Sequence, residues 1–260
     1  MSTASVLLTV AYDGAAFSGY APQKTARTVH QVLLAALATL DPSITRLRGV
    51  SRTDAGVHAR AQRVAFDPER SIPLRGWVLG TNAHLPKDVS IRQAVEVPFA
   101  FEPRAIVATK RYRYRVLVDD VRDPFIERRA LRVAPPLDLG ALRAEAATLV
   151  GTHDFAAFRS AADDRAVTVR TVSSVDVSEG AEGESRLLAI DVVGNAFLHN
   201  MVRIIVGTLL DVARGRLAPR AVARALQSGD RRDLGITAAA HGLTLEEVAF
   251  AGLAEGARWP

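Results

Sequence analysis

The sequence of 260 residues contains no cysteine. This absence excludes disulfide bonds, cysteine-based zinc sites and a thiolate nucleophile. An enzyme that attacks a pyrimidine ring through cysteine is excluded as well, so a covalent step would need another group, such as a carboxylate. The six histidines show no metal-ligand spacing, and we therefore expect no metal ion.

Signals for cofactors and membranes are also missing. No glycine-rich loop of the dinucleotide-binding or Walker type occurs, and we expect no nucleotide cofactor. The N-terminus lacks a basic segment followed by an apolar one, and no apolar run is long enough to span a bilayer. We therefore expect a cytoplasmic protein with no membrane contact.

Positive charge is in mild excess, because 33 Lys and Arg residues against 28 Asp and Glu residues give a net charge of +5. Nearly all of the basic residues are arginines, which suit bidentate phosphate contacts and stacking on bases. The excess suggests a nucleic-acid partner, and a basic soluble enzyme is the alternative. The hydrophobic content of 48% allows a large packed core.

Helical and strand-like patterns alternate along the chain. Thr28 is expected to cap a helix that ends at Asp41, and Asp138 a helix that runs to Val150. A short helix is expected at 74–79, followed by a loop at 80–86, and a long helix at 197–213. Strand-like runs occupy residues 6–12, 46–50, 62–66, 89–97, 110–118, 167–177 and 186–193.

The two halves of the chain follow a similar order of strand, loop, helix and further strands. This order predicts an α+β fold of two related subdomains, with a mixed or antiparallel sheet and flanking helices around a central cleft. We place the boundary near residue 105, which gives an N-terminal subdomain of residues 1–105 and a C-terminal subdomain of residues 106–260 that completes the cleft.

One stretch combines a carboxylate with a tight turn. Asp54 lies between two strand-like runs, two residues after Arg52 and two residues before Gly56. Glycine lets the backbone turn tightly and approach a ligand. By turn chemistry alone, this is a hairpin connection whose aspartate bonds its own backbone.

The stretch Arg52-Thr53-Asp54-Ala55-Gly56-Val57-His58-Ala59 resembles the signature of the tRNA pseudouridine synthase A family. Further matches occur in the family's order over almost the whole chain: Tyr12-Asp13-Gly14 with Phe17 and Gly19, Asn82 with Leu85-Pro86, Arg111-Tyr112-Arg113-Tyr114, Asp154-Phe155 with Phe158-Arg159, Asn195-Ala196-Phe197 with His199, Met201-Val202-Arg203 with Gly207, and Thr237-Ala238 with Gly242-Leu243. The chain departs from the family pattern at Ser51, at Ala239, at Glu102-Pro103, and at Tyr20, where tryptophan is usual. These departures concern RNA docking more than chemistry.

The resemblance implies a pseudouridine synthase fold and an isomerase that needs no cofactor. It implies a homodimer acting on uridines 38, 39 and 40 of the tRNA anticodon stem-loop. Asp54 would be the catalytic carboxylate of the N-terminal subdomain, which either attacks C1′ of the ribose or removes the 2′ proton. A non-catalytic RNA-binding or RNA-folding protein on this scaffold, or a synthase with another RNA target, is the alternative.

The same resemblance assigns roles to four further residues. Arg203 would pair with Asp54, since its apolar neighbours make an unpaired charge costly. Tyr112 would stack on the target uracil, although strand alternation puts Tyr114 on the same face. Arg52 would fill the gap left by a flipped base or hold its phosphate, with a salt-bridged turn arginine as the alternative.

The fourth is Arg159, which together with Arg27 and Arg165 would contact the RNA backbone. Each of these three arginines could instead be an ordinary solvated charge on the surface.

Overall fold

The computed structural model describes residues 4–180 and 186–252, and these form two compact units. Unit 1 comprises the described residues up to Ala108 and those from Leu245 on, and unit 2 comprises Thr109–Thr244. The sequence-based division at residue 105 differs at the C-terminal end, because the residues from Leu245 on belong to unit 1. No helix in the described ranges is long and apolar enough to cross a bilayer.

The sheet of unit 1 is built around β1 (Ala4–Tyr12). This strand pairs antiparallel with β3 (His58–Phe66) on one side and β4 (Val89–Pro98) on the other. The short β2 (Arg48–Gly49) also pairs with β3, and β10 (Leu243–Phe250) lies beside it. The central position of β1 explains its apolar sequence, because both of its faces are buried.

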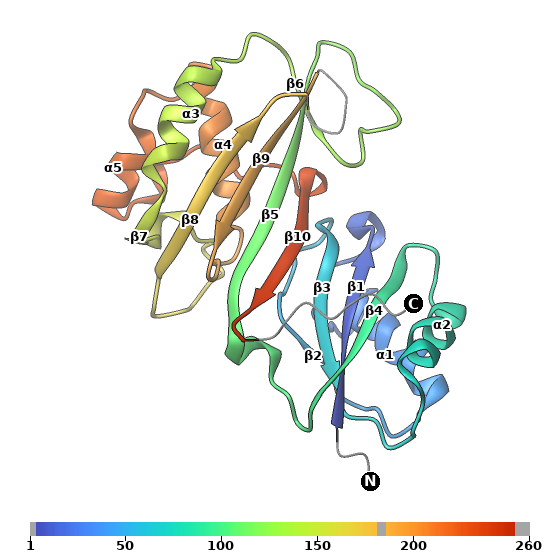
Figure 1. The fold of residues 1–260 in the computed structure, drawn as a ribbon. Coiled ribbons are helices and arrows are strands. Elements are labelled where there is room, and N and C mark those ends of the chain that lie inside the picture. The colour runs from blue at the N-terminus through green and yellow to red at the C-terminus, as the bar shows by residue number, and fades with distance from the viewer. Residues whose placement is uncertain (1–3, 181–185, 253–260) are drawn as a thin grey trace. The chain divides into compact units, whose positions relative to one another are not determined.

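Helices α1 (Val29–Leu40) and α2 (Leu74–His84) pack against each other in unit 1 (Figure 1). The predicted cap of α1 is confirmed, since Thr28 Oγ1 accepts a hydrogen bond from the backbone N–H of Gln31. The predicted loop at 80–86 is wrong over its first five residues, which continue α2. Gly80 allows this, because a Cβ there would lie 2.7 Å from Leu40 Cδ2.

The sheet of unit 2 has the order β5-β9-β8-β7 and is antiparallel throughout that path. Its strands are β5 (Val107–Val118), β9 (Leu187–Gly194), β8 (Val169–Ser178) and β7 (Gly151–Asp154), and β6 (Leu131–Val133) adds a parallel pairing to β5. The described residues thus combine a mixed sheet with flanking helices, and the predicted α+β class is confirmed.

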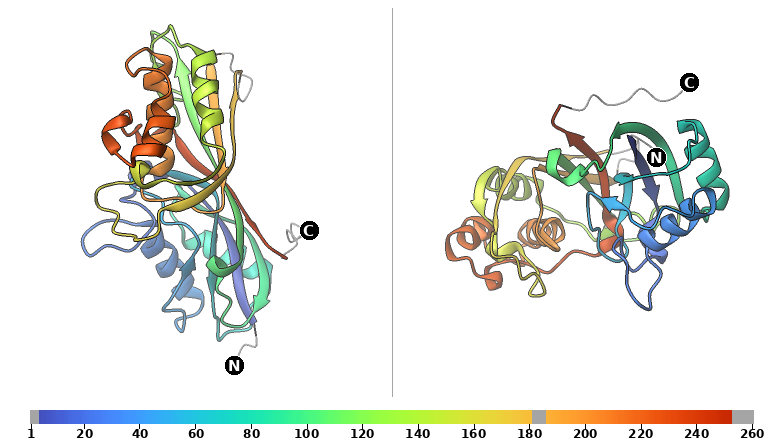
Figure 2. Two further views of the ribbon diagram at one scale, coloured as in Figure 1. Left: turned by 90° about the vertical axis from the view of Figure 1, so that its left-hand side faces the viewer. Right: turned by 90° about the horizontal axis from the view of Figure 1, so that it is seen from below.

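Three helices lie together on one face of the unit 2 sheet (Figure 2). They are α3 (Leu139–Thr148), α4 (Met201–Ala213) and α5 (Ala221–Ser228). The cap at Asp138 is confirmed, but α4 begins four residues later than predicted, because Asn200 adopts a left-handed conformation with a φ of 62°. Short 3₁₀ turns occur at η1 (Gly14–Ala16), η2 (Pro103–Ile106), η3 (Ala156–Phe158), η5 (Arg231–Asp233) and η6 (Ala240–Gly242).

Candidate active site

Asp54 lies in a turn that leads into β3, and we call residues 52–58 the aspartate loop. The backbone N–H of Val57 donates to the carbonyl of Asp54 at 3.2 Å. Gly56 has a φ of +78°, which is the conformation required at the third position of a type II turn and which glycine adopts without strain. The turn is therefore closed by the backbone of Asp54, whose side chain is half-buried.

A segment from the end of β1 holds the aspartate loop on both sides of its carboxylate; we call residues 12–20 the clamp segment. Tyr12 Oη lies 2.7 Å from Thr53 Oγ1. The Thr53 carbonyl accepts from the N–H of Tyr20 at 3.0 Å, and the N–H of Gly56 donates to the carbonyl of Phe17 at 3.2 Å. These contacts fix the backbone before and after the carboxylate.

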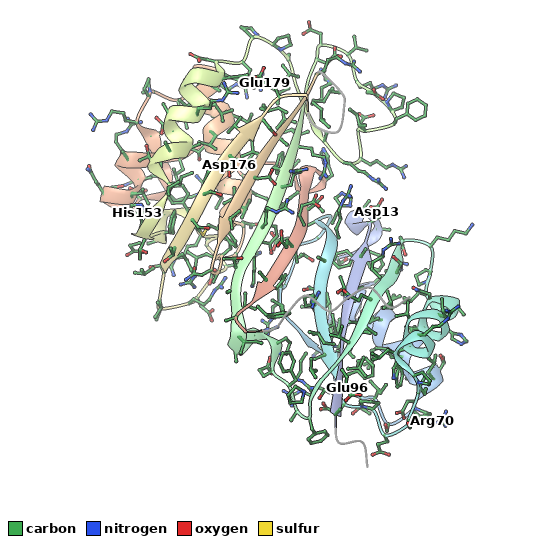
Figure 3. The ribbon with its side chains drawn as sticks, in the orientation of Figure 1. Asp13, Arg70, Glu96, His153, Asp176 and Glu179 are labelled. Carbon is green, nitrogen blue, oxygen red and sulfur yellow. The ribbon has the colours of Figure 1, made fainter. Side chains whose placement is uncertain are left out.

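The clamp segment has a glycine directly after Asp13, the residue labelled at the end of β1 in Figure 3. Close packing explains this glycine. A Cβ on Gly14 would lie 2.0 Å from the carbonyl oxygen of Val57, so any larger residue would push the aspartate loop away. The N–H of Gly14 also donates to His58 Nδ1 at 3.1 Å. The same nitrogen lies 3.2 Å from Asp13 Oδ1, so His58 attaches the clamp segment to the end of the aspartate loop and has a positioning role.

The two arginines of unit 1 that were considered for RNA contacts have different surroundings. Arg52 is exposed and makes no hydrogen bond or ion pair with any residue that the structure describes. Arg27 donates two hydrogen bonds to the carboxylate of Asp88, at 2.8 and 3.0 Å, and its guanidinium lies 4.0 Å from the centroid of the Phe17 ring. Arg27 therefore braces the clamp segment.

In unit 2, the guanidinium of Arg203 is oriented by two oxygens. Nη1 donates to Asn200 Oδ1 at 2.7 Å, and Nε donates to the carbonyl of Ala238 at 2.8 Å. The carbonyl of Arg203 accepts from the N–H of Ala238 at 3.0 Å, so the 235–238 segment is attached to the first turn of α4. Arg203 thus has a fixed position in the first turn of a mostly apolar helix.

The two tyrosines of β5 differ in burial and in partners. Tyr114 is fully buried, and its hydroxyl donates to the carbonyl of Ala239 at 2.7 Å. Burial raises the pKa of Tyr114, and the nearby charge of Arg203 offsets part of that rise. Tyr112 is 9% exposed and packs edge-on against Phe197, with ring centroids 5.3 Å apart. Of the two, Tyr112 is the less buried.

Arg159 and Arg165 belong to a loop that is tied to the ring packed on Tyr112. Arg159 Nη1 donates to the carbonyl of Arg165 at 2.9 Å. Arg165 donates to the carboxylate of Asp163 through Nε at 2.8 Å and Nη2 at 2.5 Å, and through Nη1 to the carbonyl of Phe197 at 3.2 Å. Arg165 therefore links the loop to the segment before α4.

Asp163 is a positioning residue that the sequence reading missed. Its side chain is almost completely buried and also accepts the N–H of His199 at 2.8 Å. The bond from Arg165 holds the pKa of Asp163 well below its usual value, against the effect of burial, and the His199 N–H acts in the same direction. Asn200 was missed in the same way, since nothing in the local pattern marks either side chain.

The Asp163→Asn variant is expected to lose about 1–3 kcal/mol of unfolding free energy at neutral pH, because the charge-assisted hydrogen bonds are weakened. The folded pKa lies below the unfolded one, so the contribution is present above about pH 4 and is lost as the pH falls below that value. Urea unfolding from pH 7 to pH 2, with the exposed neighbour Asp164→Asn as control, measures this. A difference from wild type that stays constant down to pH 2 would contradict the assignment.

The structure thus distributes the expected site residues over both units. Asp54 and Arg52 lie in the aspartate loop of unit 1, whereas Tyr112, Arg159 and Arg203 lie in unit 2. The three unit 2 residues are all connected to the segment 195–203 by the contacts given above. Among residues 4–180 and 186–252, no three His, Cys, Asp or Glu side chains are grouped to hold a metal ion.

Comparison with known proteins identifies relatives over nearly the full length. A family model described as tRNA pseudouridine synthase matches residues 146–251. Curated proteins named tRNA pseudouridine synthase A are similar to the chain: that of Citrifermentans bemidjiense is 43% identical over 95% of this chain and 97% of its own, and that of Halalkalibacterium halodurans is 41% identical over 91% and 89%. A solved Cbf5-Nop10-Gar1 complex gives a TM-score of 0.35 at 16% identity, covering 79% of this chain and 45% of the matched one, and it adds nothing to the assignment. From the sequence relatives, the chain belongs to the tRNA pseudouridine synthase A family.

Proposed function

We propose that this protein isomerises uridine to pseudouridine in tRNA, at positions 38, 39 and 40 of the anticodon stem-loop. The observation that carries the proposal is the aspartate loop. It presents a half-buried carboxylate on a turn that the clamp segment holds on both sides, in a chain that matches its named relatives over 91–95% of its length.

The reaction needs little more than a positioned carboxylate and a site for the base. The C1′–N1 bond of uridine breaks, a C1′–C5 bond forms, the C5 proton is lost and N1 gains a proton. Atoms and electrons balance within the substrate, so no redox partner or added group enters. In our proposal Asp54 starts this sequence, either as the nucleophile at C1′ or as the base for the 2′ proton.

Arg203 is proposed as the cationic partner of Asp54. A carboxylate in a closed site tends to take up a proton, and a guanidinium beside it favours the ionised form. The support is the fixed position of Arg203, in which Asn200 and Ala238 orient the guanidinium. A flexible arginine loses conformational entropy when it pairs with a carboxylate. Arg203 has already lost that entropy on folding, so pairing costs it less.

Tyr112, Arg52 and Arg159 are proposed to bind the RNA. Tyr112 would stack on the uracil while its ring is supported by Phe197. Removing a base from a stem costs on the order of a few kcal/mol, and the exposed Arg52 is suited to fill the gap or bind the displaced phosphate. Arg159 would contact the backbone. We also propose, from the family resemblance, a cytoplasmic homodimer that grips one tRNA with both subunits.

Binding of tRNA is expected to weaken steeply with salt, because arginine contacts to phosphates release condensed counterions. The slope of log K against log salt should be about −0.9 for each phosphate contacted in a duplex. Titration of labelled tRNA between low and moderate salt, at one pH and temperature, measures it. Affinity that does not change with salt would count against a tRNA partner.

The activity itself is tested with unmodified tRNA that carries uridine at 38, 39 and 40. The wild-type protein is incubated with this tRNA without any cofactor, and pseudouridine is mapped by chemical modification and primer extension. Signal at these positions is the expected result. Signal at other uridines would overturn the target assignment, and tRNA binding without any signal would favour the RNA-binding alternative.

A further inference from the structure

The loop between β5 and β6 exposes an aromatic side chain far from the candidate active site residues of unit 2. Phe125 is 93% exposed, more than any other large apolar side chain in the described residues, and Val121, four residues earlier in the same loop, is 68% exposed. Figure 1 shows the loop leaving β5 on the side away from α3 and α5. Isolated exposed apolar residues are common on proteins, so the construction of this loop decides whether Phe125 has a role.

The loop is built to hold one apolar residue inward and the next outward. Asp123 caps a turn, accepting from the N–H of Phe125 at 2.9 Å through its side chain and from the N–H of Glu127 at 2.9 Å through its carbonyl. Ile126 packs inward against a buried cluster that contains Leu117 and Leu187. Phe125 is consequently presented outward by an ordered backbone, which lowers the entropic cost of binding through it.

Ion pairs secure the base of the loop and engage two of its four carboxylates, those of Asp119 and Asp123. Arg186 bonds the carboxylate of Asp119 and lies 3.4 Å from that of Asp123, and Arg132 donates to the carbonyl of Asp120 at 2.9 Å. The exposed part of the loop keeps arginines on both sides of the ring: Arg122 before it, and Arg128 and Arg129 after it. Arg122 makes no hydrogen bond or ion pair within the described chain.

We propose that this loop binds RNA, with an unstacked base on Phe125 and a neighbouring phosphate on Arg122. The inference rests on the proposed function, which supplies tRNA as the RNA. An aromatic ring flanked by arginines matches the chemistry of an unpaired nucleotide, since the ring stacks on the base and the guanidinium binds phosphate. A second copy of this chain fits less well, because a loop meeting its own copy would bring the same arginines together.

The contact is a second one, distinct from the uracil site. Tyr112 and Val118 are six residues apart on β5, which separates them by about 20 Å in an extended strand, and Phe125 lies beyond Val118. The base on Phe125 is therefore a different nucleotide from the target uridine, and our proposal places it outside the anticodon arm. Such a contact would let the enzyme read the body of the tRNA as well as its anticodon arm.

The test compares Phe125→Ala and Arg122→Ala with a matched control, Phe99→Ala, which removes a phenylalanine that is 60% exposed beside Pro98 and Ala100. Loss of one stacked base corresponds to a rise in Kd for full-length tRNA of about tenfold, seen as a rise in KM with kcat unchanged. Arg122→Ala should lower the salt slope by about 0.7–0.9. With an isolated anticodon stem-loop as substrate, all variants should behave like wild type.

Equal KM for Phe125→Ala and Phe99→Ala on full-length tRNA would overturn the proposal. So would a rise in KM on the stem-loop alone, which would place the contact next to the target. Sedimentation of the wild type and of Phe125→Ala tests the remaining occupant, a second copy of the chain. A dimeric wild type with a monomeric variant would assign the loop to a contact between subunits. Failure of the wild type to form pseudouridine would refute the proposed function instead, and tRNA binding by the same variants would still test the loop.

Discussion

The Asp54→Asn variant is expected to bind tRNA like the wild type and to form no detectable pseudouridine. Asparagine has the size of aspartate and keeps the backbone carbonyl that closes the turn with Val57, so the aspartate loop should fold unchanged. The amide cannot attack C1′ or accept the 2′ proton as a carboxylate can. Removal of such a group lowers turnover on the order of 10⁴-fold or more in enzymes that depend on it.

The measurement pairs filter binding of labelled tRNA with mapping of pseudouridine at single-turnover enzyme excess, so that slow product release does not hide residual chemistry. Asp138→Asn is the matched control, since asparagine caps a helix as well as aspartate does and Asp138 caps α3 in unit 2. Turnover by Asp54→Asn within tenfold of wild type would remove Asp54 from the catalytic role. Loss of binding as well would show that the carboxylate positions RNA.

The sequence around Asp54 predicts the turn but not what holds it. Gly56 marks the tight turn locally, and its φ is indeed positive. The clamp depends on Tyr12 meeting Thr53, 41 residues later, and no periodicity within either segment carries that information. Both segments are identified by their resemblance to family motifs. The hydrogen bonds between them give the physical reason why they occur together.

In unit 2 and in α2 as well, the sequence predicts local features but not the long-range contacts that decide the structure. Alternation in β5 correctly places Tyr112 and Tyr114 on one face, but it does not predict that Tyr114 is fully buried and bonded to Ala239 whereas Tyr112 packs on Phe197. In α2, Gly80 is typical of a loop, yet packing beneath Leu40 outweighs its low helix propensity. Asp163 is a buried carboxylate whose two partner residues, Arg165 and His199, are not marked by any local pattern.

The Gly207→Ala variant is expected to lose about 3 kcal/mol or more of unfolding free energy, at the upper end for overpacked sites. A Cβ at this position of α4 would lie 1.8 Å from the carbonyl oxygen of Ile236. The segment cannot simply move away, because the N–H of Gly235 donates to Thr208 at 3.1 Å and that of Ala238 to Arg203 at 3.0 Å. Such a loss corresponds to a fall in Tm of about 6–12 °C in a chain of this size.

Activity should fall together with stability in this variant, since displacing the 235–238 segment removes the carbonyl that orients Arg203. Gly140→Ala in α3 is the control: that glycine is exposed, and its added Cβ would meet only Asp138 Oδ1, at 3.2 Å, a contact that a shift of a few tenths of an ångström relieves. It should change the free energy of unfolding by less than about 1 kcal/mol, with helix propensity favouring alanine. Calorimetry and single-turnover assays on both variants, run well below the lower Tm, separate the two effects. If Gly207→Ala melted like Gly140→Ala, the close packing of α4 on the 235–238 segment would be refuted, and with it the physical reason for glycine one turn after Arg203.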